Sequence, residues 1–408
     1  MMLFHSEKNL TNGRKIHPTV WALGFVSLFM DISSEIIHSL LPVFLVSIIG
    51  ASVQTVGLIE GMAEATAMVT RVFSGSLSDW LGKRKGLAVV GYGLGALSKP
   101  LFALASSSSA VFSARFIDRV GKGIRGAPRD ALVADVTPPE QRGAAYGLRQ
   151  SLDSIGSFAG PLLATGLMFL TGGHFRLIFW IALIPGVLAI AMLLLGVREP
   201  VAVSSKSFRS PLSRQSLSLL GRRYWLVVLI GTIFTLARFS EAFLLLRAES
   251  VGLNISLIPL VLVVMNIAYS LTAYPVGLLS DKIGRQGLMA LGLIVLIVSD
   301  VLLALAGGLW LVFAGAAFWG LHMGLTQGLI SALIADAISP EVRGTAFGVF
   351  GLVSGMALLS ASVLAGWLWQ NFGAPATFWG GTFIAVLTLL LFLGLYYGSK
   401  NQAEPCLK

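Results

Sequence analysis

The sequence predicts an all-α integral membrane protein with twelve transmembrane helices in two pseudo-symmetric bundles of six. Three observations predict this architecture: an apolar composition, twelve apolar segments of membrane-spanning length, and motifs that occur twice at nearly one spacing. Hydrophobic residues make up 55% of the 408 residues and charged residues only 12%, and the mean hydropathy is +0.83. A soluble protein carries about 25% charged residues, so this composition excludes a water-exposed surface and makes lipid the natural solvent.

The apolar segments have the length that a membrane requires. A helix that crosses ~30 Å of hydrocarbon needs roughly 20 mostly apolar residues. The first segment is longer than a signal-peptide core and lacks a small-residue cleavage site, so we expect it to be retained as a span. The twelve segments, separated mostly by short breaks rich in Gly, Pro, Ser or charge, begin near Val20, Thr55, Gly86, Ala110, Gly143, Phe175, Tyr224, Ile255, Gly287, Trp310, Thr345 and Thr377.

One break is long and basic, and it divides the chain. Residues 198–223 hold six Lys and Arg residues against a single acid, Glu199. Alternate loops, on the same side as this break, also carry Lys and Arg, whereas the intervening loops hold almost none, so the positive-inside rule predicts cytoplasmic termini in the inner (plasma) membrane. The expected organisation is a cytoplasmic tail, a bundle, a cytoplasmic linker, a second bundle and a cytoplasmic tail at residues 1–17, 18–197, 198–223, 224–399 and 400–408.

Two motifs indicate that one half duplicates the other. The stretch at residues 134–147, ADVTPPEQRGAAYG, returns 201 residues later as ADAISPEVRGTAFG, with eight of fourteen positions identical. The stretch at residues 75–83, GSLSDWLGK, returns 202 residues later as GLLSDKIGR. Two independent motifs at nearly one offset imply a duplicated half.

These motifs resemble those of the major facilitator superfamily of transporters. Residues 75–85, GSLSDWLGKRK, are similar to the signature that this family carries between helices 2 and 3. The resemblance covers nearly the whole chain and implies the family fold and a secondary transporter working by alternating access, similar to prokaryotic proton-coupled permeases. It also implies a cytoplasmic charge network that latches the two halves together. The alternative for the cations at 83–85 is that they only enforce the topology, which they are expected to do in either case. The members of the expected network are Gly75, Asp79, Gly82, Lys83, Arg84, Asp135, Glu140, Arg142, Asp281, Gly284, Arg285, Asp336, Glu341 and Arg343.

The fourth segment carries an unusual number of charges. Each charge inside a bilayer costs about 2.5–3.5 kcal/mol on insertion scales, so it needs a partner, a water-filled cavity or a function. Five cations and two acids share one helical face, namely Arg115, Asp118, Arg119, Lys122, Arg125, Arg129 and Asp130. The excess of cations requires anionic neighbours or an anionic substrate. Residues 119–123, RVGKG, are similar to the helix-4 motif of proton-coupled antiporters, but Lys122 replaces a residue that is usually neutral.

The expected partners of these cations lie on the first segment, where Asp31, Glu35 and His38 share one stripe. In the family fold, helices 1, 4, 7 and 10 line the central cavity. The resemblance therefore implies that Asp31 or Glu35 pairs with Arg119 or Lys122, and that protonation of the carboxyl is linked to substrate binding. The alternative is a permanent ion pair that only fixes helix packing.

Other charges in the segments divide into a coupling group and a structural group. Arg238 and Glu241, three residues apart on the seventh segment, join the coupling candidates. Glu60 and Glu64 are expected to be neutralised by Arg71 on their own helix, and a second such pair is expected on the fifth segment. A solvated position near the outer end is expected for Asp300, whereas His322 and Trp319 are weak cavity candidates. The pair expected within the fifth segment is that of Arg149 with Asp153.

The leading expectation for function is a proton-coupled transporter of a small anionic or zwitterionic organic solute. Multidrug efflux is the nearest alternative, and transport of a divalent metal or a metal siderophore, with Asp31, Glu35 and His38 as ligands, is a lesser one. The motifs of a membrane enzyme are absent from the sequence, and the single cysteine, Cys406, excludes an intramolecular disulfide. We expect no bound metal or cofactor besides the proton gradient, no nucleic-acid partner, and a monomer in the lipid bilayer.

Overall fold

The computed structural model describes residues 16–199, 217–283, 285–338 and 343–403, and every regular element in them is helical. The elements of the first half are α1 (Pro18–His38), α2 (Leu41–Val43), a π-helical turn η1 (Phe44–Ile48), α3 (Val53–Leu81), α4 (Arg84–Leu104), α5 (Ser108–Asp135), a 3-10 turn η2 (Pro139–Gln141), α6 (Arg142–Leu170), α7 (Phe175–Ile181) and α8 (Leu183–Gly196). Those of the second half are α10 (Arg222–Leu236), α11 (Ala242–Ser250), a 3-10 turn η3 (Ile255–Leu257), α12 (Leu260–Ile283), α13 (Arg285–Ala304), α14 (Leu309–Asp336), α15 (Arg343–Phe372) and α16 (Ala374–Ala403).

The prediction of twelve spans is confirmed. Three spans consist of more than one element: α1 continues through α2 and η1, α7 is followed directly by α8, and α10 is followed by α11. By length and composition, nine helices in the described residues are apolar enough to cross a membrane. The other three spans are α3 and α5, which carry several charged side chains, and the α10–α11 pair, in which the interruption leaves two short helices of 15 and 9 residues.

Capping residues set the ends of the charged helices. The hydroxyl of Ser52 accepts a hydrogen bond from the backbone N–H of Thr55 at the start of α3, and Ser107 does the same for Ala110 at the start of α5. Such caps satisfy backbone donors that a helix leaves unpaired. The α3 helix ends at Gly82, whose φ of 62° lies in the left-handed region that favours glycine. This requirement gives a local reason for the glycine in the motif at residues 75–85.

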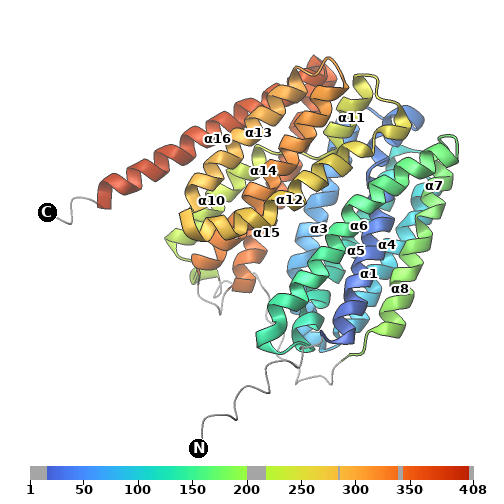
Figure 1. Ribbon diagram of the computed structural model, residues 1–408, viewed down its shortest axis with the longest axis horizontal. Helices are drawn as coiled ribbons and strands as arrows, with labels where there is room; N and C mark the ends of the chain where they lie inside the picture. The colour runs from blue at the N-terminus through green and yellow to red at the C-terminus, as the bar shows by residue number, and fades with distance from the viewer. Residues whose placement is uncertain (1–15, 200–216, 284, 339–342, 404–408) are drawn as a thin grey trace, which may run out of the picture.

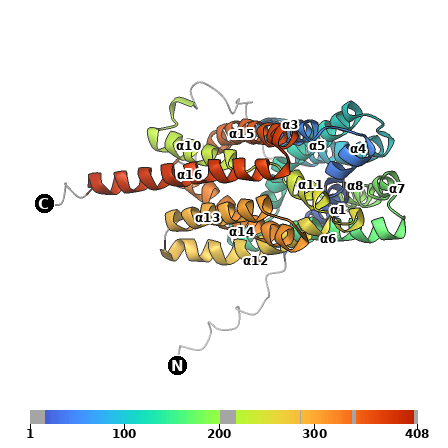
Figure 2. The same cartoon turned by 90° about the horizontal axis from the view of Figure 1, so that it is seen from above.

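The two bundles lie side by side, the first drawn blue to green and the second yellow to red (Figures 1 and 2). Their main contact is between α3 and α15, where small residues let the backbones approach closely. A methyl group on Gly366 would lie 2.9 Å from Cα of Gln54, and one on Gly57 would overlap the carbonyl oxygen of Ser362. These glycines are therefore part of the seam between the bundles.

Two hydrogen bonds between the bundles cross the seam at other places. The side-chain amide of Asn266 on α12 donates to the carbonyl oxygen of Ser157 on α6 at 3.0 Å. The hydroxyl of Ser47, in η1, donates to Glu249 of α11. The prediction of two six-helix bundles is confirmed. Its exact boundaries stay a prediction, because most of the tail and linker residues lie outside the described part.

The seam predicts a sharp difference between two glycine substitutions. Gly57→Ala forces the α3 and α15 backbones apart and should destabilise the protein by about 1–3 kcal/mol, which a thermal melt of the detergent-solubilised protein would register as a lower Tm. Gly93→Ala on α4 is the control, because its added methyl group meets nothing within 4 Å. Equal melting temperatures for the two variants would contradict the close packing of α3 on α15.

Candidate functional site

The charged face of α5 is buried among other helices. Arg115 and Arg119 are only 1% and 2% exposed. Two glycines bring α5 close to its neighbours: a methyl group on Gly121 would lie 2.6 Å from the carbonyl oxygen of Gly91 on α4, and one on Gly123 would lie 2.5 Å from Cβ of Thr70 on α3. The prediction that this face turns away from lipid is confirmed.

Carboxylates of α3 neutralise the first two cations of α5. Nη2 of Arg115 lies 2.6 Å from Oε2 of Glu60, and Nη1 of Arg119 lies 3.0 Å from Oε1 of Glu64. The expectation that Arg71 neutralises these two acids within α3 is therefore wrong, since Arg71 pairs with Asp130 of α5 at 3.6 Å. The helical period shows which of these side chains share a face of their own helix, but it does not show which neighbouring helix that face contacts.

A buried lysine on α4 joins the ion pairs between α3 and α5. Nζ of Lys99 lies 2.8 Å from Oδ1 of Asp118 and donates to the hydroxyl of Ser34 on α1 at 3.1 Å. Asp118 also faces Arg115 and Arg119, at 3.9 Å and 3.6 Å. Sequence reasoning missed Lys99, although a signal was present: it is the only charged residue between positions 86 and 104.

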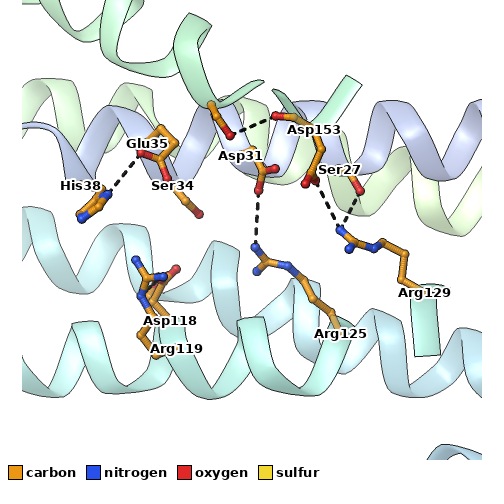
Figure 3. Close-up of polar contacts among 12 residues, drawn as sticks. Ser27, Asp31, Ser34, Glu35, His38, Asp118, Arg119, Arg125, Arg129 and Asp153 are labelled. Carbon is orange, nitrogen blue, oxygen red and sulfur yellow. Dashed lines mark hydrogen bonds and ion pairs between the residues drawn. The ribbon is translucent and has the colours of Figure 1, made fainter. Parts of the chain in front are cut away.

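The acids of α1 do not form the pairs that the sequence suggested. Oδ1 of Asp31 lies 3.9 Å from Arg125, and Oε2 of Glu35 lies 3.2 Å from Nδ1 of His38 (Figure 3). The expected pairing of Asp31 or Glu35 with Arg119 or Lys122 is therefore wrong. The other nitrogen of His38 lies 3.8 Å from Glu60, which ties α1 to the pairs on α3.

A second cluster lies further along α5. Arg129 lies 3.5 Å from Asp153 of α6 and donates to the hydroxyl of Ser27 at 3.0 Å (Figure 3). It also lies 3.1 Å from Asp130. The predicted pair of Arg149 with Asp153 is present at 3.8 Å, but it is part of this cluster, because Arg149 also lies 3.8 Å from Asp130.

The networks border two cavities that meet at the same side chains. The larger, of about 400 Å³, lies within the first bundle, and the smaller, of about 170 Å³, lies between the bundles. Glu35, Glu64, Met68 and Lys122 line both. The second bundle contributes Arg238, Phe239, Ser240, Glu241 and Leu358 to the smaller cavity. Arg238 and Glu241 therefore face the α1 and α5 candidates, as the resemblance implied.

Lys122 differs from every other cation on its face. It is exposed, and it makes no ion pair or hydrogen bond with any residue that the structure describes. Arg115, Arg119, Arg125 and Arg129 all have carboxylate partners. The expected excess of positive charge on α5 is thus neutralised by protein carboxylates at all positions except the one that borders both cavities.

The second bundle contains three further residues that the sequence singled out. His322 is buried and bonds through Nδ1 to the carbonyl oxygen of Gly292 at 2.8 Å, so it is a packing residue. Trp319 is fully buried against Phe239, and neither it nor His322 lines either cavity. Asp300 is 0% exposed, so the expected solvated position near the helix end is wrong.

The metal-ligand arrangement suggested for α1 does not form. Asp31 turns to Arg125, away from Glu35 and His38. Within the described ranges, no group of three His, Cys, Asp or Glu side chains is placed to hold a metal ion. The lesser alternative of divalent metal transport through this stripe has no geometric support here.

The ion pairs seen in the expected latch network stay within one half each. Arg84 lies 3.0 Å from Asp135, both in the first half, and Arg285 pairs with Asp336, both in the second. Arg142 donates to the carbonyl oxygen of Ala134, near the end of α5, at 3.4 Å. The other members stay predictions: Lys83, Glu140 and Arg343 are exposed, Gly75 packs on Ala127, and Gly284, Glu341 and the side chains of Asp79 and Asp281 lie outside the described residues.

Comparisons with known proteins agree with this architecture. The family model of the Major Facilitator Superfamily matches residues 23–246 and 229–405. An uncharacterized MFS-type transporter of Methanocaldococcus jannaschii is 33% identical over 398 residues, which cover 95% of this chain and 97% of that protein. The quinolone resistance protein NorA of Staphylococcus aureus is 24% identical over 236 residues, or 57% of this chain and 59% of NorA. The crystal structure of the nucleoside transporter NupG matches with a TM-score of 0.76 at 14% identity, over 93% of this chain and 99% of NupG.

Twelve spans in two bundles, with paired charges around cavities within and between them, define a multi-pass membrane transporter. The chain belongs to the major facilitator superfamily.

The ion pairs predict a specific stability pattern. Glu60→Gln removes the carboxylate that lies 2.6 Å from the buried Arg115, leaving it only Asp118 at 3.9 Å, and should cost about 3–5 kcal/mol, measured as a lower Tm of the purified protein. The control is Glu140→Gln, an exposed site whose Tm should not change. The double variant Glu60→Leu with Arg115→Leu should recover most of the loss, because removing both charges also removes the unpaired one. A Glu60→Gln variant as stable as Glu140→Gln would contradict the pair.

Proposed function

We propose that this protein is a proton-coupled transporter of a small anionic or zwitterionic organic solute, which it moves by alternating access. The observation that carries the proposal is Lys122, an unpaired cation at the junction of both cavities. The exposed ammonium group of Lys122 attracts a carboxylate or phosphate, and the surrounding protein, whose dielectric is lower than that of water, strengthens this attraction.

The opposite wall of the smaller cavity supports a zwitterionic or polar solute. Arg238 and Glu241 lie there on the second bundle, and neither has an ion pair within the described part of the chain. A solute with one carboxylate and one amine has complementary charges for Lys122 on one bundle and Glu241 on the other. Such a solute bridges the two bundles, so its binding would be linked to their relative position.

Proton coupling is proposed for the carboxyl groups around Lys122. Glu35 borders both cavities and lies 3.2 Å from Nδ1 of His38. Asp31 and Asp153 lie close enough for each to act on the charge of the other. Two neighbouring carboxylates repel each other, and one bound proton relieves that repulsion. A solute anion at Lys122 would change the balance of charges on these groups.

The broken seventh span supports movement of the bundles. The helix stops at Leu236 and resumes at Ala242, and Arg238, Phe239, Ser240 and Glu241 occupy the interruption. In transporters, discontinuous helices commonly form substrate and ion sites near the middle of the membrane. We place the C-terminal bundle's contribution to the solute site at this interruption.

Multidrug efflux is the second candidate, and one observation favours it. The smaller cavity contains three carboxyl groups, Glu35, Glu64 and Glu241, beside the apolar side chains of Met68, Phe239 and Leu358. A lipophilic cation would fit such a lining, and NorA is a relative over part of the chain. Lys122 and Arg238 in the same cavity oppose a cation, so we keep the anionic or zwitterionic solute as the first candidate.

We further propose an inner-membrane location with cytoplasmic termini and linker, a monomer as the working unit, and the proton gradient as the driving force without another cofactor. The distribution of Lys and Arg in the loops supports the orientation.

The solute class is tested by a thermal-shift screen of the purified protein against carboxylates, organic phosphates, amino acids and lipophilic cations. Solutes with a carboxylate or phosphate should raise the Tm. Lys122→Gln should weaken that binding about 10- to 100-fold, the loss expected for a charged hydrogen bond, while Lys122→Arg should retain part of it. Arg223→Gln, at an exposed position outside both cavities, is the charge-matched control. Stabilisation by lipophilic cations alone would refute the anionic or zwitterionic solute.

Coupling is tested with a solute identified in that screen and protein reconstituted in liposomes with an imposed pH gradient. Glu35→Gln should abolish gradient-driven uptake but spare exchange of labelled for unlabelled solute, because exchange needs no net proton movement. Wild-type vesicles treated with a protonophore, which dissipates the pH gradient, give the solute uptake that remains without a proton driving force. If Glu35→Gln vesicles accumulate solute as the wild type does, Glu35 is only a structural partner of His38.

A further inference from the structure

Asp300 is a buried acid that the proposed solute site does not use. It lies on α13 and is 0% exposed, and neither of its carboxyl oxygens has a hydrogen-bond partner within the described residues. Buried polar groups in proteins are nearly always hydrogen-bonded, and an isolated ionised carboxylate in an apolar region is prohibitively costly. A carboxyl in this position therefore needs either a bound proton or a partner that arrives at another stage.

The surroundings of Asp300 are aromatic and apolar. A methyl group on Gly381 of α16 would lie 2.6 Å from Oδ2 of Asp300 and 3.0 Å from Cε1 of Phe239, so the carboxyl and the ring border the same glycine. The ring of Phe239 also packs on Trp319 and Phe378, with centroids 5.2 Å and 5.6 Å away.

Among the described residues of the surrounding elements, no charged side chain reaches Asp300. On α14, His322 bonds to the carbonyl oxygen of Gly292. On α11, Arg247 donates to the carbonyl oxygens of Leu303, Ala304 and Ala306 at the end of α13. The described side chains of α12 and α16 include no Asp, Glu, Lys, Arg or His, and Arg238 and Glu241 lie beside Phe239 on the cavity side. None of these groups is within ion-pair distance of Asp300.

Phe239 connects this acid to the cavity between the bundles. The residue lines that cavity, and its ring borders the same Gly381 as the carboxyl of Asp300. Phe239 also lies in the interruption between α10 and α11. Its backbone is outside the regular helices, so the ring can move without breaking helical hydrogen bonds.

We propose that Asp300 is a proton-binding site of the C-terminal bundle, separated from the central cavity by the ring of Phe239. In the arrangement seen here the carboxyl holds its proton, and displacement of Phe239 opens it to the water of the cavity. Ionisable groups inside membrane bundles commonly belong to proton relays. The site goes beyond the proposed function, because it involves neither Lys122 nor the solute.

The proposal is tested on the purified full-length protein by infrared difference spectroscopy between neutral and alkaline pH. The wild type should show at neutral pH a carbonyl-stretching band of a protonated carboxylic acid that the near-isosteric Asp300→Asn variant lacks. Identical spectra for the two proteins in that region would overturn the assignment.

The role of Phe239 is tested by the pH at which the same band disappears. Phe239→Ala should move that midpoint to lower pH, because water then reaches the carboxyl. Phe392→Ala is the matched control, since this buried ring packs on Phe234 and not on the Phe239 cluster. Equal midpoints for the two variants would contradict the separating role of Phe239.

A measurement on the wild type covers the case in which Asp300→Asn does not fold. Dicyclohexylcarbodiimide adds to protonated carboxyl groups in apolar surroundings, and a peptide map by mass spectrometry should show its adduct on Asp300 at neutral pH but not at alkaline pH. A map with Asp300 unmodified at neutral pH would count against the bound proton. None of these results depends on solute binding, so their failure would leave the proposed transport function standing.

Discussion

The structure depends on one constraint: each ionised side chain within the bundles must find an opposite charge or water. The α5 helix carries the densest set of cations, and α3 supplies Glu60 and Glu64 against Arg115 and Arg119. These pairs fix the rotation of α5 and its contact with α3. Breaking one pair would leave an uncompensated buried charge, which is far more costly than the pair itself is stabilising. Which helices of the first bundle contact each other therefore depends on the ion pairs between them as much as on the burial of apolar surface.

The same constraint connects packing with function. Glycines at positions 121 and 123 bring α5 against α4 and α3 and close its charged face to lipid. Cavities remain where the faces of several helices do not meet, and Lys122 borders both the larger and the smaller one. The three spans that do not qualify as continuous apolar membrane helices, α3, α5 and α10–α11, all contribute side chains to the smaller cavity. The charges within α3 and α5 and the break between α10 and α11 therefore occur in spans that line the candidate site.

Sequence patterns predicted the spans, the duplicated halves and the charged face of α5, because each is a local or periodic property of the chain. Partners across helices were not predictable in the same way. Periodicity places Glu60 and Arg115 on faces but does not say which faces meet, so Glu60 was assigned to its own helix. Asp300 shows the same limit: its place near the end of α13 suggested a solvated position, but the side chain is buried beside Gly381 of α16. Lys99 could have been noticed as a lone cation in an apolar segment.

The central claim, that Lys122 faces a hydrated path between paired charges, is tested most directly by its access to water. The single native cysteine allows a Cys406→Ser background in which position 122 carries the only thiol. We predict that Lys122→Cys in this background reacts with a membrane-impermeant, negatively charged methanethiosulfonate. Leu97→Cys, at a position on the outer surface of α4 that is 64% exposed, should face lipid and stay unlabelled. Labelling of position 122 no faster than position 97 would contradict the account.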